Sequence, residues 1–196
     1  MDLFLPFTRA GKTTEQIAIK VKRHFGLGPY AGVDPWELLP SLPARLIGLE
    51  YFPPDIRSIL TGRGRSAWSA IGYGKSPVDG KELILLNSAH HEHRQRASLM
   101  EEVVHIVLDH PKVLLQFDGT GSWRRPFEKE IEDEAYNVGA ACIIPYKPLF
   151  EAVKYEGLPA TAIAERYVVS VGYVEFRIKR AGLYRVYQKQ CVPHAN

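Results

Sequence analysis

Residues 96–111 read RASLMEEVVHIVLDHP. Leu99, Val103 and Val107 recur in this segment at the spacing of one helix face. Such a pattern predicts an amphipathic helix, here over residues 96–109, whose apolar face is part of the core.

Polar side chains with metal-binding chemistry gather on one side of this predicted helix. Glu101, His105 and Asp109 lie at i, i+4 and i+8, and Glu102 lies one step round the same side. A carboxylate and an imidazole four residues apart can chelate one metal ion, as the histidines of H-E-x-x-H metallopeptidases do. In those enzymes the Glu after the first His activates the metal-bound water. The same spacing also fits an ordinary surface pair worth roughly a few tenths of a kcal/mol, so the motif alone leaves both interpretations open.

A second helix is predicted over residues 127–143 and carries another carboxylate beside its apolar stripe. The stripe consists of Ile131, Ala135, Val138 and Cys142. Glu134 borders it, and the small residues Gly139–Ala141 would let another helix approach closely. A carboxylate beside an inward face is costly to bury without a partner, and a metal held by the preceding helix would be one. The alternative is that Glu134 is one more member of the acidic run Glu128–Glu134.

The remaining chain predicts smaller elements. Thr13-x-x-Gln16 resembles a capping box that begins a first helix. Strand patterns at residues 66–73 and 82–87 flank turn-forming residues and predict a hairpin. The tail from Gly157 onward predicts two short helices and a final extended piece, Leu183–Val186.

The composition sets the broad class. The chain has 196 residues, 45% of them hydrophobic and 24% charged, which excludes a disordered or fibrous protein. Two cysteines are too few for a disulfide scaffold and favour a reduced, intracellular setting. No stretch approaches the roughly 20 apolar residues that cross a bilayer. The N-terminal apolar run lacks the features of a signal peptide, so we expect a cytoplasmic protein that does not contact a membrane.

Charge is divided unevenly along the chain. The formal net charge is only +3, too weak to indicate a nucleic-acid binder. Residues 97–134 hold nine acids and four bases, a local net of −5. Residues 157–196 hold two acids and six bases, a local net of +4. The acidic centre is where a cation would be held, and the basic tail is a candidate docking surface.

The two central helices together resemble the ImmA/IrrE family of metallopeptidases, whose members read R-x-x-L-x-H-E-x-x-H and then E-A-N-x-F-A-A-x-L-L-M-P. The matches to the first string are Arg96, Leu99, Glu102 and His105. The matches or near matches to the second are Glu134, Ala135, Ala140, Ile143 and Pro145. The similarity covers roughly residues 13–150.

The resemblance implies a fold and a site. The expected fold is α+β, with a minimal zincin-like core over residues 1–150 in which a small antiparallel sheet packs on the active-site helices. A helix-turn-helix-like C-terminal element would follow over residues 151–196. Carried over by position, Glu101, His105 and Glu134 would hold the metal, and Glu102 would be the catalytic base.

Glu101 departs from the family pattern, which has His at this position. Two carboxylates and one imidazole make a harder and more anionic ligand set than two imidazoles and one carboxylate. Zinc remains the expected ion, with manganese or another divalent ion that prefers oxygen as the alternative. The added negative charge should weaken the metal as a Lewis acid. The site is therefore expected to be either an altered enzyme or a degenerate one.

Other residues could replace the missing ligand. Asp109 shares the stripe of Glu101 and His105, whereas His110 is predicted to be rotated away and to cap the C-terminal end of the helix. His90, His91 and His93 form a second cluster, predicted to lie in a solvated loop. One of these three histidines could still reach the site.

Three functional hypotheses follow. The first is a metallo-endopeptidase that cuts a regulatory protein, which the resemblance implies is typically a helix-turn-helix repressor cleaved under stress. The second is a binding module on a degenerate peptidase scaffold. The third is a DNA-binding regulator that acts through a helix-turn-helix at residues 161–183, with Arg177, Lys179 and Arg180 on its second helix. The aromatic residues of this segment favour packing or substrate docking over base recognition.

Overall fold

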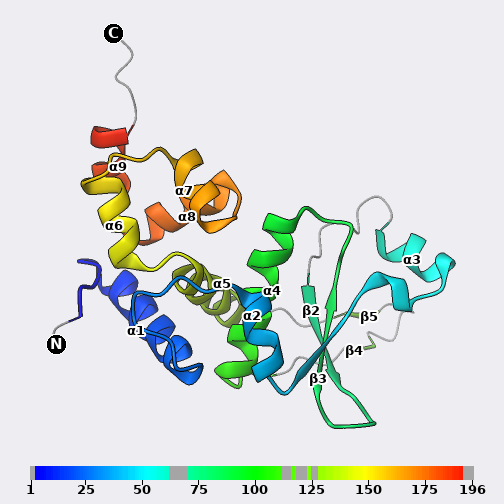
Figure 1. Cartoon of the computed structure of the whole chain (residues 1–196). Coiled ribbons are helices and arrows are strands. Elements are labelled where there is room, and N and C mark those ends of the chain that lie inside the picture. The colour runs from blue at the N-terminus through cyan, green and yellow to red at the C-terminus, as the bar shows by residue number, and fades with distance from the viewer. Residues whose placement is uncertain (1–2, 62–69, 112–115, 118–122, 125–127, 192–196) are drawn as a thin grey trace.

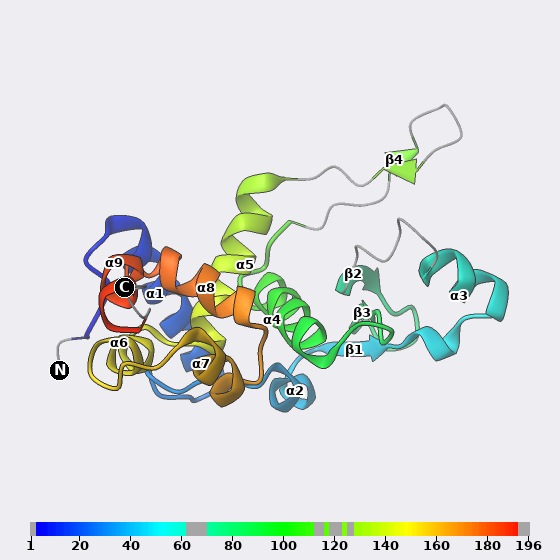
Figure 2. The same cartoon turned by 90° about the horizontal axis from the view of Figure 1, so that it is seen from above.

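The computed structural model describes residues 3–61, 70–111, 116–117, 123–124 and 128–191. The fold is mixed α+β and mostly helical, as the sequence predicts. A small sheet lies at one end and a group of helices at the other, and helix α4 lies between them (Figures 1 and 2). The helices are α1 Arg9–His24, α2 Pro35–Leu38, α3 Pro54–Thr61, α4 Glu92–Val107, α5 Lys129–Ile143, α6 Tyr146–Lys154, α7 Ala160–Tyr167, α8 Val171–Arg180 and α9 Tyr184–Cys191.

The main sheet has three strands in the order β1 (Ala44–Ile47), β3 (Glu82–Leu86), β2 (Ala70–Lys75). Strands β2 and β3 form the expected antiparallel hairpin, although part of the predicted first strand falls outside the described residues. Strand β1 pairs with β3 in parallel, so the sheet is mixed and not antiparallel. Strand β1 lies inside residues 29–65, a segment rich in Pro and Gly in which the sequence indicates only short helical or strand pieces and does not locate them. A second, two-stranded ribbon joins β4 (Gln116–Phe117) to β5 (Trp123–Arg124).

Helices α4 and α5 cross at close range in the middle of the molecule. Leu99 and Val103 of α4 are completely buried, as the apolar face predicts. A Cβ atom placed on Gly139 of α5 would lie 3.5 Å from the backbone nitrogen of Glu101. Gly139 therefore lets the two backbones approach, which confirms the role predicted for the small residues of α5.

Helix α1 begins earlier than the sequence predicts. Its N-cap is Thr8, whose hydroxyl oxygen accepts a hydrogen bond from the Gly11 backbone N–H at 3.2 Å. Thr13 lies inside the helix and donates its hydroxyl hydrogen to the Arg9 carbonyl oxygen. The predicted capping box at Thr13 is therefore wrong, because a better-placed hydroxyl lies five residues earlier. Shortly after the helix ends at His24, Gly26 adopts a left-handed backbone with a φ of +71°.

The tail contains the predicted helix-turn-helix. Helix α7 ends at Tyr167 and is capped by Val168, whose φ is +53°. Helix α8 begins after Ser170, whose side chain accepts from the Tyr173 backbone N–H. The extended piece predicted at Leu183–Val186 is wrong, because α9 occupies this segment. Leu183, Val186 and Tyr187 lie at helical spacing and contact the main hydrophobic cluster.

The tail packs onto the rest of the chain. One hydrophobic cluster extends from Ala18 in α1 to Leu183 before α9. The boundary predicted at residue 150 lies inside α6, whose Leu149 and Val153 belong to that cluster. Among the described residues, no helix combines the length and the apolar character needed to cross a membrane.

Candidate metal centre

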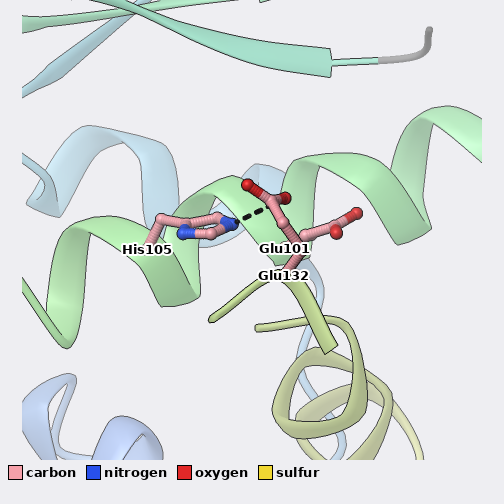
Figure 3. A group of neighbouring side chains, drawn as sticks. All are labelled: Glu101, His105 and Glu132. Atoms are coloured by element: carbon pink, nitrogen blue, oxygen red, sulfur yellow. Dashed lines mark ion pairs between the residues drawn. The ribbon is translucent and has the colours of Figure 1, made fainter. Parts of the chain in front are cut away.

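The structure brings together three potential metal ligands from two helices. Glu101 and His105 project from successive turns of α4, and Glu132 projects from the first turn of α5 (Figure 3). One ligand atom from each lies within 4.8 Å of the other two. His105 Nε2 lies 3.5 Å from Glu132 Oε2, an ion pair drawn as a dashed line in Figure 3.

The donor atoms fit a divalent cation. His105 Nε2 is buried and has no hydrogen-bond partner in the described part of the chain. An orphaned buried nitrogen is costly unless something binds it. It faces a carboxylate, so a cation between the two would satisfy both groups. One imidazole nitrogen with two carboxylates is a ligand set that zinc and manganese both accept.

The carboxylates around His105 control its charge. Burial by itself would lower the pKa of His105, because it disfavours the charged imidazolium. The carboxylates of Glu132, Glu102 and Glu101 act in the opposite sense and hold the pKa above its ordinary value of 6.5. The position therefore favours a positive charge, whether a proton or a metal ion supplies it.

Glu102 lies on the sheet side of α4. Glu102 is only 8% exposed. A Cβ atom on Gly72 of β2 would lie 3.2 Å from Glu102 Oε2, so the absence of a side chain at Gly72 leaves room for the carboxylate. Glu102 is therefore a buried carboxylate between α4 and β2. Its role as catalytic base stays a prediction.

Glu134, which the resemblance implies as the third ligand, lies outside this three-residue group. Its Oε2 lies 3.2 Å from Nε2 of His110, and its side chain is 44% exposed. The reason is helical geometry: two residues advance about 200° around a helix, so Glu132 and Glu134 cannot face the same point. Glu132 is the one that faces His105.

The end of α4 differs from the prediction as well. Asp109 is exposed and adopts a φ of +52°, and it therefore ends the helix and does not join the ligand stripe. The His110 backbone N–H donates to the His105 carbonyl oxygen at 3.0 Å, which folds the chain back over α4. His110 is thus not rotated away: its ring centroid lies 4.9 Å from that of His105.

The other histidine cluster lies at the opposite end of α4. His91 caps the helix by accepting from the His93 backbone N–H through Nδ1. His93 and His105 are twelve residues apart on one helix, which corresponds to about 18 Å. The cluster that includes His90 therefore does not join the metal centre.

Glu132, which the sequence analysis does not single out, and His110, whose predicted orientation is wrong, left different signals in the sequence. Glu132 shares a helical stripe with Tyr136 and Gly139, and Gly139 is the residue at which α5 touches α4. That stripe could have distinguished Glu132 from Glu134. His110 left no such signal, because its position depends on the left-handed backbone of Asp109.

A groove with a cavity volume of about 580 Å³ lies between α1, α5 and α8. Its charged lining residues are Arg9, Glu130, Asp133, Glu134 and Arg180. Arg177 does not reach this surface, because it is 1% exposed and paired with Glu15. The structure therefore excludes Arg177 as a DNA contact, and this removes one of the residues on which the DNA-binding hypothesis depends.

Comparison with known families agrees with the geometry. The model of the Peptidase_M78 family, described as the IrrE N-terminal-like domain, matches residues 61–179. This is more than half of the chain, and it includes α4, α5 and all three clustered ligands. No curated protein matches the chain. The family match supports a metallopeptidase-type function.

Proposed function

Because the chain belongs to the Peptidase_M78 family of IrrE N-terminal-like domains, we propose that it is a metal-dependent endopeptidase. The observation that carries the proposal is the convergence of Glu101, His105 and Glu132, with ligand atoms within 4.8 Å of one another, beside the buried carboxylate of Glu102. The family match alone would not locate the site, and the cluster alone would not indicate peptide hydrolysis.

In this proposal each residue has a separate task. Glu101 and Glu132 supply carboxylate oxygens, and His105 supplies Nε2, to hold a divalent cation. When bound, such an ion polarises a peptide carbonyl and lowers the pKa of a water molecule. Glu102 accepts the proton of the attacking water and returns it to the leaving amine. Its enclosed position between α4 and Gly72 keeps the carboxylate out of bulk solvent.

Zinc is the proposed ion, and Glu101 is the reason that manganese is its competitor. A ligand set with two carboxylates is harder than one with two imidazoles, and harder sites favour ions that prefer oxygen. The same substitution favours the second candidate function, a degenerate scaffold that binds a partner without cleaving it. Binding of metal without proteolysis would identify that alternative.

The proposed substrate is a regulatory protein of the helix-turn-helix repressor type, cleaved in the cytoplasm. This part of the proposal rests on the family resemblance. A protein substrate is compatible with the open groove between α1, α5 and α8, which carries both acidic and basic side chains. DNA is the weaker candidate partner, because Arg177 is buried.

The metal is tested first, by equilibrium titration of chelator-treated protein with zinc and with manganese. We expect one ion per chain, with binding abolished in Glu132→Ala. The matched control is Glu130→Ala, which removes an exposed carboxylate from the same helix turn. Equal zinc affinity of the two variants would eliminate Glu132 as a ligand.

Proteolysis is tested next, with the metal-loaded protein and a panel of helix-turn-helix repressors. Mass spectrometry of the products should show one or a few new termini that appear only with metal and disappear with chelator. Stoichiometric metal binding without any cleavage of the panel would favour the degenerate scaffold over the enzyme for those substrates.

A further inference from the structure

A chain of four polar side chains leads away from the candidate metal centre. Glu132 Oε2 lies 3.5 Å from His105 Nε2. His105 Nδ1 lies 3.0 Å from His110 Nδ1, and His110 Nε2 lies 3.2 Å from Glu134 Oε2. Two imidazoles therefore lie between two carboxylates, and both nitrogens of each ring face another of these side chains.

Local backbone geometry builds this chain. The positive φ of Asp109 reverses the backbone at the end of α4, so that His110 lies over His105 with the ring planes at 78°. The His110 side chain is 8% exposed, which makes it more enclosed than the His105 side chain at 14%. Glu134, at 44%, lies at the solvent end of the chain.

When His105 binds a cation through Nε2, only one placement of the ring protons fits these four side chains. A neutral imidazole that uses its Nε2 lone pair for a metal carries its proton on Nδ1. His105 Nδ1–H must then donate to His110 Nδ1, which accepts. The proton of neutral His110 is consequently on Nε2, where it donates to the Glu134 carboxylate. The reverse order would set a lone pair of His110 against that carboxylate, which is repulsive.

We propose that His110 and Glu134 are positioning residues, which hold His105 in the Nδ1–H tautomer and in the ring orientation that binds a divalent cation. This inference rests on the proposed function, since it requires His105 to be a metal ligand. Hydrogen-bonded partners of ligating histidines act in this way generally, and their removal costs roughly 10-fold to 100-fold in metal affinity. Here the hydrogen-bonded partner of His105 is the imidazole of His110, which the carboxylate of Glu134 holds in turn.

The affinity test uses zinc and variants that keep the packing. His110→Phe retains an aromatic ring but removes the acceptor, and we expect zinc to bind roughly 10-fold to 100-fold more weakly. Glu134→Gln retains an acceptor for His110 Nε2–H and should lose less than Glu134→Ala. The controls are His93→Phe and Glu130→Gln. They change the same residue types outside the four interacting side chains and should leave the zinc affinity unaltered.

A spectroscopic test separates positioning from general structural support. Nitrogen-15 NMR of the zinc-loaded protein should show His110 protonated on Nε2, and His105 protonated on Nδ1. Wild-type zinc affinity in both His110→Phe and Glu134→Ala, or a proton on His110 Nδ1, would overturn the inference while leaving the proposed function intact. Failure of the wild-type protein to bind zinc or manganese would instead overturn the proposed function, and this inference with it.

Discussion

The guanidinium of Arg177 in α8 forms an ion pair with the carboxylate of Glu15 in α1, although 162 residues separate them in the sequence. Both side chains are almost completely buried, at 1% and 2% exposed. Arg177 Nε also donates to the Ile144 carbonyl oxygen, and the other oxygen of Glu15 accepts from the Tyr146 backbone N–H. The pair thus connects the tail to α1 and to the junction between α5 and α6.

Replacing Arg177 should therefore destabilise the whole protein. Arg177→Met leaves Glu15 buried without its cation, and removal of one partner of a buried pair costs about 3–5 kcal/mol. The measurement is urea unfolding followed by circular dichroism. The control Arg185→Met, at an exposed site on α9, should change the free energy of unfolding by less than about 0.5 kcal/mol. Similar results for the two variants would show that the pair contributes nothing.

The double variant Glu15→Leu/Arg177→Met distinguishes an unpaired charge from lost packing. If the single variant is unstable because Glu15 is left alone, removal of that carboxylate should restore part of the lost stability. We expect only part of the lost stability to return, because the Tyr146 N–H also loses its acceptor in the double variant. A double variant less stable than either single one would argue for packing instead.

The sequence predicts local features of this fold well and long-range ones poorly. The apolar spacing of Leu99 and Val103 is enough to predict α4, because one face of a helix repeats within a few residues. The pairing of Glu15 with Arg177 has no local signature, since it depends on how distant helices dock. The sequence pattern alone therefore indicates Arg177 as a candidate DNA contact in a basic tail, whereas in the structure Arg177 is buried.

The same difference between local and long-range features applies to the candidate metal centre. Glu101 and His105 can be predicted as a pair because both lie on one helix with a fixed spacing. The third ligand depends on the angle at which α5 crosses α4, which the sequence does not specify. An acidic run offers several carboxylates at that crossing, and the structure places Glu132, rather than Glu134, beside Glu101 and His105.

Glu102→Gln should separate catalysis from metal binding. Loss of a general base lowers the rate by roughly 100-fold to 10,000-fold, whereas the ligands remain in place. The measurements are initial cleavage rates and zinc affinity on the same preparation. Glu92→Gln, at an exposed site in the first turn of α4, is the control. Cleavage at the wild-type rate would remove Glu102 as the base.

Glu101→His should shift the metal preference toward zinc. The change creates a ligand set of two imidazoles and one carboxylate, which is softer and less anionic. We expect the ratio of zinc to manganese affinity to rise at least about tenfold, since even outer-shell changes have effects of that size. Competition titration with both ions measures the ratio. An unchanged ratio would mean that residue 101 does not contact the ion.

Cys142 should make the protein less stable at alkaline pH. Complete burial raises the pKa of the Cys142 thiol from the ordinary 9.0 to about 12. Between these pH values the unfolded chain loses the thiol proton and the folded chain keeps it. The free energy of unfolding therefore falls as pH rises. The stabilising effect is therefore fully present below pH 9.0 and is lost toward pH 12. The measurement is the free energy of unfolding at several alkaline pH values.

The buried ammonium of Lys22 beside Cys142 acts in the opposite direction, so the comparison must be made with a variant. Burial lowers the pKa of Lys22, and its deprotonation favours the folded state as pH rises. Cys142→Ala retains the lysine and removes only the thiol, so its unfolding free energy should fall less steeply with pH than that of the wild type. Equal slopes would contradict the prediction. Thiol labelling provides an independent check, because the half-buried Cys191 should react in the folded protein while Cys142 reacts only after unfolding.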